Sequence, residues 1–373
     1  MKVAGLFAGI GGFEVGLSKS GHEAAFFCEL DPAAASILRR RFPGVEIQSD
    51  IRTLGSLPSN IDLVTAGFPC QNLSSSGLKA GITGTQSSLV SEVFRLLESR
   101  PVEWVLIENV HFMLHLNKGA GMRAVVEGLE QLGYSWAYRL LDTESFGLPQ
   151  RRRRVFILAS LNHDPRNVLL SEDAPAAPIR ELSIQQPVGF YWTEGTYATG
   201  LAANSVPPLK GGSTIGIPSP PAIMMPDGLV GTPDIRDAER LQGFAEDWTN
   251  DPAVGRSSFR WRLIGNAVSV NVSAWLGSKL ASPDRYDHQN DDPISSDEWP
   301  NAAWNVGGGK YKSRASSRPL LGVEAGLGDF LRHPLKPLSA KATSGFLKRA
   351  RKGNLKFPEG FLIRLDRHLK HCA

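Results

Sequence analysis

Residues 3–12 have the sequence VAGLFAGIGG, an apolar run followed by a glycine-rich turn. The run at 3–7 predicts a short buried strand, and residues 12–20 have helical spacing, so the glycines lie between a strand and a helix. Glycine permits a tight turn there and lets a ligand approach the backbone at the start of the helix. Glycine turns in α/β proteins also serve purely structural purposes. The segment therefore predicts the first strand, turn and helix of an α/β fold, and leaves both interpretations of the glycines open.

The same alternation continues over the first 160 residues. Short apolar runs predict strands at 24–28, 45–47, 62–66, 104–107, 137–141 and 155–159. Helical spacing lies between them at 32–41, 89–99 and 121–132. Strands that alternate with helices indicate a parallel sheet covered by helices. We expect an α/β fold with a Rossmann-like, doubly wound and mostly parallel sheet.

A lone cysteine follows the apolar run at 61–66. Gly67 and Pro69 end this run, which places Cys70 at the carboxyl end of a predicted strand. Open α/β sheets build their sites at this edge, although most free cysteines are small buried core residues. The chain has only three cysteines, which do not make a disulfide framework. Cys70 is therefore a candidate reactive group, with a core position as the alternative.

Acidic residues follow three of the other predicted strands. Glu29 follows the second strand, where such folds hold ribose hydroxyls, whereas Asp31 before Pro32 has the pattern of a helix cap. Asp50 follows the third strand and is placed either for an adenine edge or amine or for a turn cap. Glu108 follows the apolar run at 104–107. Each position predicts a carboxylate near the carboxyl end of a strand.

Four arginines, Arg151 to Arg154, lead directly into an apolar strand. The period of two along a strand places Gln150, Arg152 and Arg154 on one face, and Arg151 and Arg153 on the other. One face can then enter a site while the other meets solvent or phosphate. A solvated run of charge is the ordinary alternative.

The charge of the chain is uneven. Of 41 Lys and Arg residues 11 lie in 331–373, together with 2 of the 37 acidic residues, so this segment carries +9 and residues 1–330 carry −5. A basic tail attracts polyanions, and a solvated basic face is the alternative. No apolar stretch approaches the roughly 18 residues of a membrane span, and the start has no signal-peptide pattern. We expect a cytoplasmic protein.

Composition divides the rest of the chain. Proline and glycine punctuate 165–235, which predicts a small irregular β-rich domain, and helical spacing returns in 236–280, which completes the first domain at 1–164. Residues 281–335 are polar and predict a flexible linker. Apolar spacing in 336–373 predicts a basic C-terminal extension with a helical unit.

Eight segments occur in a set order along residues 1–280: Phe7-x-Gly9-x-Gly11-Gly12, Glu29, Asp50-Ile51, Pro69-Cys70-Gln71, Glu108-Asn109-Val110, Gln150-x-Arg152-x-Arg154, Arg240-Leu241-Gln242-Gly243-Phe244 and Gly265-Asn266-Ala267-Val268. Together they resemble the C5-cytosine DNA methyltransferases of bacteria and their phages. The ordered set is specific, although no single segment is. The resemblance does not extend to 281–373.

The resemblance implies transfer of a methyl group from S-adenosylmethionine, which leaves as S-adenosylhomocysteine, to C5 of a cytosine. In that chemistry the Cys70 thiolate adds to C6 and makes C5 nucleophilic. Glu108 holds N3 and the exocyclic amine, and Arg152 and Arg154 steady the base and its covalent adduct. A base inside the duplex is out of reach, so the cytosine is flipped out.

The resemblance also implies which residues bind. Leu30 stands where an aromatic residue next to the adenine is common in the family, and no metal site is expected. The residues expected to hold the methyl donor are Phe7, Gly9, Gly11, Gly12, Glu29, Asp50, Ile51, Pro69, Asn266 and Val268. Those expected to contact DNA are Gln71, Ser74, Gln150, Thr214 and Gln242.

The protein that the resemblance implies is a sequence-specific DNA (cytosine-5)-methyltransferase with a target-recognition domain at 165–235. Its expected partners are double-stranded DNA and a cognate restriction endonuclease that acts on the same site. We expect a monomer in a bacterial cell or a phage-infected host. Two alternatives stay open: a methyltransferase of this fold that acts on RNA, and a non-catalytic DNA-binding relative.

Overall fold

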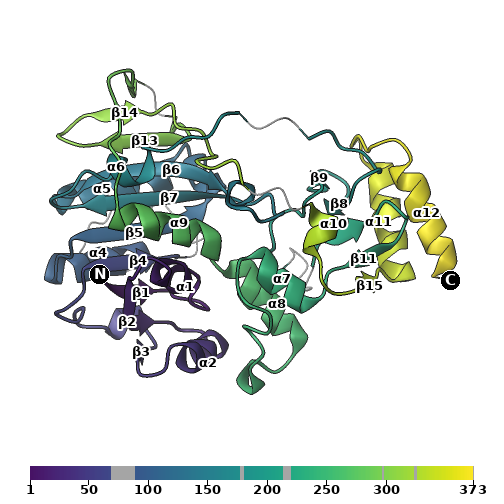
Figure 1. Cartoon of the computed structure of the whole chain (residues 1–373), viewed down its shortest axis with the longest axis horizontal. Helices are drawn as coiled ribbons and strands as arrows, with labels where there is room; N and C mark the ends of the chain where they lie inside the picture. The colour runs from purple at the N-terminus through teal and green to yellow at the C-terminus, as the bar shows by residue number, and fades with distance from the viewer. Residues whose placement is uncertain (69–88, 177–179, 213–219, 296–297, 323–325, 373) are drawn as a thin grey trace. The chain divides into compact units, whose positions relative to one another are not determined.

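Parallel strand pairing organises the first 110 residues of the computed structural model. β1 (Lys2–Leu6) pairs with β2 (Glu23–Cys28) on one side and with β4 (Leu63–Ala66) on the other. β3 (Glu46–Gln48) adds to β2, and β5 (Trp104–Val110) adds to β4. All five strands run in the same direction, so their carboxyl ends meet at one edge of the sheet (Figure 1).

The structure describes residues 1–68, 89–176, 180–212, 220–295, 298–322 and 326–372. The chain forms two units, each built from three segments. The first unit comprises Met1–Ser145, Arg153–Pro175 and Val268–Leu321. The second unit comprises Phe146–Arg152, Ala176–Ala267 and Gly322–Ala373.

The main sheet of the first unit is mixed rather than mostly parallel. β6 (Ser135–Asp142) and β7 (Arg153–Ser160) pair antiparallel with each other, and β7 also pairs antiparallel with β5. The strand order is β12-β14-β13-β6-β7-β5-β4-β1-β2-β3. The expected α/β class is therefore correct, and the parallel pairing is confined to the part from β3 to β5.

Helices cover both faces of this sheet (Figure 1). α1 (Gly12–Ser18) packs against α9 (Val270–Ala281), where Gly16 leaves no room for a side chain beside Ser273. α4 (Leu89–Ser99) and α5 (Ala120–Gln131) lie on the opposite face. The short α6 (Arg166–Leu169) and α2 (Pro32–Arg41) complete the unit, and the Asp31 side chain caps α2 by accepting a hydrogen bond from the Ala33 N–H.

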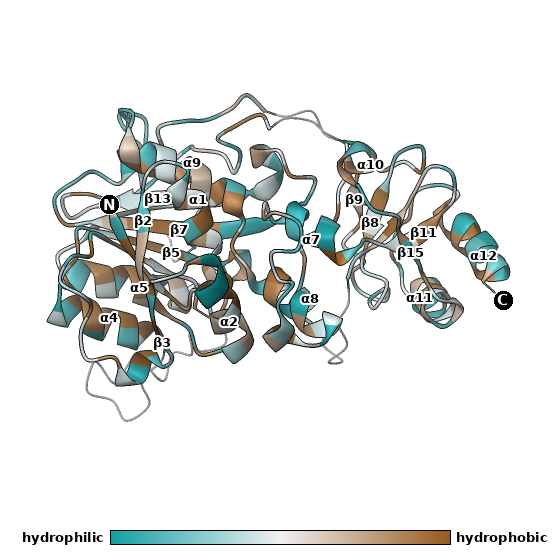
Figure 2. Ribbon diagram, turned by 60° about the horizontal axis from the view of Figure 1, so that its bottom comes forward, coloured by the Kyte–Doolittle hydropathy of each residue, from teal (hydrophilic) through white to brown (hydrophobic). Residues whose placement is uncertain are grey.

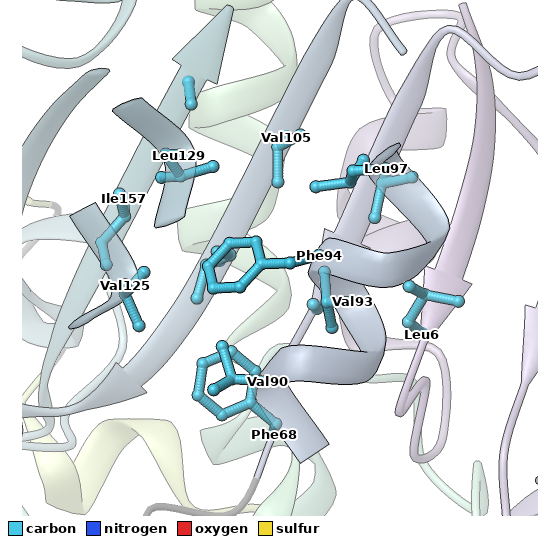
Figure 3. Packing of buried hydrophobic residues seen from close by; sticks show 14 of the residues in the cluster. Leu6, Phe68, Val90, Val93, Phe94, Leu97, Val105, Val125, Leu129 and Ile157 are labelled. Atoms are coloured by element: carbon cyan, nitrogen blue, oxygen red, sulfur yellow. The ribbon is translucent and has the colours of Figure 1, made fainter. Parts of the chain in front are cut away.

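The core of the first unit lies between the sheet and the pair α4 and α5. Val90, Phe94 and Leu97 project from α4 toward the sheet, where Phe94 lies near Val105 and Val125 (Figure 3). Hydrophobic and hydrophilic residues alternate along both helices (Figure 2). Burial of such an apolar face is the main source of helix stability in a protein of this kind.

The expectation of a flexible linker at 281–335 is wrong for much of this segment. β13 (Ala302–Asn305) pairs with β6, and β14 (Lys310–Lys312) and β12 (Asp292–Pro293) continue the main sheet beyond it. The buried Trp299 donates a hydrogen bond from its indole N–H to the Gly119 carbonyl. These strands have two to four residues each, too few to show an alternation of apolar and polar residues, so the sequence around them resembles a linker.

The second unit has an antiparallel five-stranded sheet in the order β15-β11-β10-β8-β9. The strands are β8 (Val188–Phe190), β9 (Ala202–Ala203), β10 (Ala222–Met224), β11 (Val230–Thr232) and β15 (Lys336–Pro337). The helices are α7 (Ile235–Leu241), α8 (Ser257–Asn266), α10 (Leu327–Phe330), α11 (Ala340–Lys352) and α12 (Phe361–His371).

The C-terminal residues are part of this unit and not a separate extension. β15 pairs with β11, and α11 and α12 supply Phe346 and Phe361 to a core built around Phe190 of β8. The expectation that 336–373 forms an appended basic tail on a flexible linker is therefore wrong. Of residues 236–280, which we expected to complete the first domain, 236–267 also belong to the second unit.

No helix among the described ranges has both the length and the apolar character needed to cross a membrane.

Phe346→Ala tests the structural role of the C-terminal helices. Phe346 is fully buried against Phe190, so the substitution should destabilise the second unit by about 3–5 kcal/mol. Ser344→Ala on the exposed side of the same helix is the matched control and should change little. Thermal and denaturant unfolding measure the difference. A Phe346→Ala variant as stable as the control would contradict the described packing.

Candidate active site

The turn after β1 contains three residues with left-handed backbone. Phe7, Gly9 and Gly11 have φ values of 55°, 57° and 83°. Glycine adopts this region freely and phenylalanine rarely does, so Phe7 is a strained position of the kind found at binding sites. A Cβ added at Gly11 would lie 2.6 Å from the Phe42 ring, whereas one added at Gly9 would have nothing within 4 Å. The turn thus leaves open space beside the backbone of Gly9.

Glu29 ties the end of β2 to this turn. Its Oε2 accepts a hydrogen bond from the Gly9 N–H and its Oε1 accepts one from the Asp31 N–H, both at 2.7 Å. Burial raises the pKa of the Glu29 carboxyl, and the two N–H groups oppose that rise. A carboxylate oxygen accepts more than one hydrogen bond. Glu29 therefore keeps acceptor capacity beside the open space at Gly9.

Asp50 caps the turn that follows β3. Its carboxylate accepts a hydrogen bond from the Arg52 N–H at 3.0 Å at the start of the 3₁₀ helix η1 (Ile51–Thr53), and Ile51 is buried. The Arg52 guanidinium lies 2.7 Å from the same carboxylate and lowers its pKa. The cap, one of the two interpretations of Asp50, is present. A role of Asp50 toward a ligand stays a prediction.

Glu108 forms an ion pair across the antiparallel strands β5 and β7. Its Oε1 lies 3.1 Å from Nε of Arg154, and both side chains are largely buried. Its Oε2 is the nearest atom that a Cβ added at Gly67 would meet, at 3.9 Å. One carboxylate oxygen is thus held by an arginine while the other points toward the backbone that follows β4.

Asn109 fixes the end of the chain segment that leads to Cys70. Its Nδ2 donates a hydrogen bond to the Phe68 carbonyl at 3.2 Å, and its Oδ1 accepts one from the Val110 N–H. The Phe68 ring packs edge-on against Phe7 with ring centroids 6.3 Å apart. The expected site residues Pro69, Cys70, Gln71, Ser74 and Thr214 lie outside the described residues.

Comparisons with known proteins agree on one family. Residues 1–191 match the C-5 cytosine-specific DNA methylase family. The chain is 48% identical over 382 positions to the type II methyltransferase M2.BsuMI of Bacillus subtilis (strain 168), with 98% of each chain covered. The chain belongs to the C-5 cytosine-specific DNA methylase family. It is a DNA (cytosine-5)-methyltransferase, as the resemblance implied.

Other relatives extend this result. The methyltransferase is 30% identical over 295 residues to type II methyltransferase M.NgoBI of Neisseria gonorrhoeae, which covers 73% of this chain and 90% of that one. The crystal structure of the S. pombe Dnmt2 methyltransferase is similar with a TM-score of 0.56 at 20% identity, covering 75% of this chain and 98% of that one. This structural likeness confirms the α/β fold.

Two glutamines that we predicted as site residues, Gln150 and Gln242, lie inside the second unit. Gln150 donates to the Leu241 carbonyl at 2.8 Å and accepts a hydrogen bond from the Leu209 N–H at 2.9 Å. Gln242 donates to the Ile264 carbonyl at 2.9 Å. Both glutamines are fully buried. Their polar groups bind the backbone of their own unit, so this arrangement does not provide the direct DNA contact that we expected of them.

Arg152 has a similar place. Its guanidinium donates to the carbonyls of Leu209, Gly265 and Ala267 at 3.0, 3.3 and 3.0 Å, and the side chain is buried. The alternation along the strand is correct, since Arg151 and Arg153 are exposed. Arg152, however, binds three carbonyls of two backbone segments in its own unit, which differs from the expected contact with the flipped base.

Val268 and Asn266, the expected end of the donor pocket, fall in different units. The Val268 carbonyl lies against Gly12, because a Cβ added at Gly12 would be 2.4 Å from it. Asn266 lies beside Gly211 in the same way, with an added Cβ 2.3 Å from its Oδ1. Each glycine is therefore required for close approach of another segment.

The sequence did not reveal Glu14 as a buried acid. Glu14 lies in α1, where a charged residue normally faces solvent, but here its Oε1 accepts a hydrogen bond from Thr65 at 2.8 Å and Gly5 makes room for it. Burial raises the pKa of Glu14 to about 7. Gly5 inside β1 was the only signal in the sequence that another side chain approaches this strand closely, and a glycine in a strand is a weak signal.

Glu14→Gln should change how stability depends on pH. A carboxyl with a folded pKa of about 7 contributes full stability below its unfolded pKa, and the contribution falls as pH rises toward the folded pKa. Between pH 5 and pH 8 the wild type should lose about 2–3 kcal/mol more than the variant. Denaturant unfolding at the two pH values measures this. Parallel pH profiles for the two proteins would show that Glu14 is ionised in the fold.

Proposed function

We propose that this methyltransferase transfers a methyl group from S-adenosylmethionine to C5 of a cytosine flipped out of a specific duplex sequence, with a covalent bond between Cys70 and C6. One observation carries the proposal. Glu108, paired with Arg154, has its second carboxylate oxygen facing Gly67, three residues before Cys70. This supports an acid and a thiol acting on one base.

The turn after β1 suits the methyl donor. Open space lies beside Gly9, Glu29 offers acceptors for ribose hydroxyls, and the Leu30 side chain is 62% exposed and can cover an adenine ring. When bound, the donor supplies the methyl group that C5 takes up and leaves as S-adenosylhomocysteine. We assign its binding to Phe7, Gly9, Gly11, Gly12, Glu29, Asp50, Ile51, Pro69, Asn266 and Val268.

Cys70 and Glu108 divide the chemistry on the base. C5 of cytosine is a poor nucleophile. Addition of the Cys70 thiolate forms an S–C6 bond and moves the C5–C6 π electrons toward C5. The Glu108 carboxyl accepts a hydrogen bond from the exocyclic N–H of the base and holds the proton at N3, which compensates the charge that develops on the ring. After methylation, solvent water takes up the C5 proton, and elimination of the Cys70 thiolate restores the C5–C6 double bond.

Arg154 acts as a positioning residue in this scheme. It holds Glu108 Oε1 at 3.1 Å, so the carboxylate has one orientation before the base arrives. A charge-assisted contact fixed in advance costs no reorganisation during the reaction. Arg152, which binds backbone carbonyls of its own unit, contributes to the shape of the second unit instead.

The biological setting is part of the proposal. Several relatives carry the name type II methyltransferase, which supports a restriction–modification system with a cognate endonuclease as partner. We propose that the protein acts as a monomer in the bacterial cytoplasm or in a phage-infected host. Residues 165–235 carry the target recognition, with Gln71, Ser74 and Thr214 as the DNA contacts.

Cys70→Ala should abolish methylation and preserve donor binding, because the thiol serves the base and not the donor. Transfer of labelled methyl groups to duplex DNA and to RNA measures activity, and calorimetry measures binding of S-adenosylhomocysteine. Cys372→Ala, at an exposed cysteine, is the matched control and should be fully active. Turnover by Cys70→Ala would exclude the covalent route, and transfer to RNA alone would exclude the DNA substrate.

Glu108→Gln should slow methyl transfer by about 10²–10⁴-fold while DNA binding stays intact, because the amide keeps the shape and loses the proton. Single-turnover kinetics and a gel-shift assay measure the two effects. Glu98→Gln, an exposed glutamate on α4, serves as the control. A Glu108→Gln variant that turns over at the wild-type rate would remove Glu108 from the mechanism.

A further inference from the structure

α11 has two opposite faces. Its buried face consists of Thr343, Phe346, Leu347 and Ala350, which pack into the core of the second unit. At 100° per residue, Lys341, Lys348 and Lys352 fall within about 40° of one another on the opposite side of the helix, and all three are exposed. We call these three residues the lysine stripe. The rise of the helix gives the stripe a length of about 16 Å.

The lysine stripe lacks counter-charges. None of its three lysines forms an ion pair with another described residue, whereas nearby Arg351 pairs with Asp366 at 2.5 Å. The segment 331–373 holds 11 basic and 2 acidic residues, so few acids are available to neutralise it. An unpaired row of ammonium groups on a rigid helix complements a row of anions.

The C-terminal end of α11 supports a neighbouring loop. Arg349 donates to the carbonyls of Trp192 and Glu194 at 2.7 and 3.0 Å. Gly353 approaches the same loop so closely that an added Cβ would lie 2.5 Å from the Thr196 carbonyl. The next residue, Tyr197, has a side chain that is 92% exposed. An aromatic ring thus stands beyond the end of the lysine stripe on a loop that α11 itself holds.

We propose that the lysine stripe and Tyr197 form a surface that binds the phosphate backbone of duplex DNA. This inference rests on the proposed function, which makes duplex DNA the substrate. Each strand of duplex DNA carries one phosphate per about 3.4 Å of helix axis, so the stripe spans several phosphates and its three lysines can contact two or three of them. Tyrosine donates a hydrogen bond to phosphate oxygen or packs against sugar. Such contacts position a protein on DNA and carry no base sequence.

The proposed surface gives a role to the basic residues of 331–373 within the folded second unit, whereas we had expected them in a separate tail. Deleting 331–373 would remove Phe346 and Phe361 from the core, so truncation would test folding rather than binding. Substitution of exposed lysines leaves that core intact. The test therefore uses the full chain.

The decisive variant is Lys348→Gln with Lys352→Gln. The slope of log K against log salt is negative, and each lost phosphate contact reduces its magnitude by about 0.9. Loss of both lysines should therefore reduce the magnitude by about 1.8. The Michaelis constant for DNA should rise several-fold, with an unchanged kcat at saturating DNA and an unchanged methylated motif. Arg367→Gln with Lys370→Gln, on the exposed side of α12, removes the same charge and should leave the slope near the wild-type value.

Replacement of Tyr197 by the photo-crosslinker benzoylphenylalanine provides an independent readout. The probe should crosslink to duplex DNA, and the same probe at Ile363, exposed on α12, should not. An unchanged salt slope in the lysine variant would show that the stripe is a solubilising face that does not bind DNA. An equal reduction of the slope in the lysine variant and in the α12 control would show a general effect of charge. Wild-type methylation of the same duplex, measured alongside, shows separately whether the proposed function holds.

Discussion

The pairing of β4 with β1 on one side and β5 on the other is the constraint on which the site depends. Leu6 lies opposite Ala66, and Ala66 lies opposite Ile107. The next residues along the three strands are Phe7, Gly67 and Glu108, which begin the glycine turn, the segment leading to Cys70 and the acidic motif. A slip of one residue in this register would turn each side chain of the strand to the other face of the sheet. Burial of the face that packs against α4 and α5 therefore fixes the register, and with it the position of the three segments that follow the strands.

Much of this arrangement could be predicted because its signals are local. Apolar runs ended by glycine, proline or an acid mark strand ends, and parallel topology brings those ends together without further information. The contact partner of a given side chain, in contrast, could not be predicted from local signals. The bond from Asn109 to the Phe68 carbonyl and the burial of Glu14 against Thr65 depend on residues 41 and 51 positions away. Neither contact leaves a pattern in its own segment.

The second unit was harder to predict for the same reason. Its strands have two or three residues, too few to show alternation, and β15 pairs with β11 across more than 100 residues of chain. The alternation at 150–154 correctly separated buried from exposed side chains. It could not show that Arg152 and Arg154 belong to different units. The prediction therefore gave one role to Arg152, which binds backbone carbonyls of the second unit, and to Arg154, which pairs with Glu108 in the first unit.

The interleaved chain path also sets an order of assembly during translation. The first unit has all its segments once residue 321 is made, whereas the second unit needs Gly322–Ala373. At roughly 5–20 residues per second, synthesis of that last stretch takes about 3–10 s. Until then Phe190 lacks its partners Phe346 and Phe361. A nascent chain therefore has every segment of the first unit before the second unit can close, and the core of the second unit stays incomplete for this interval.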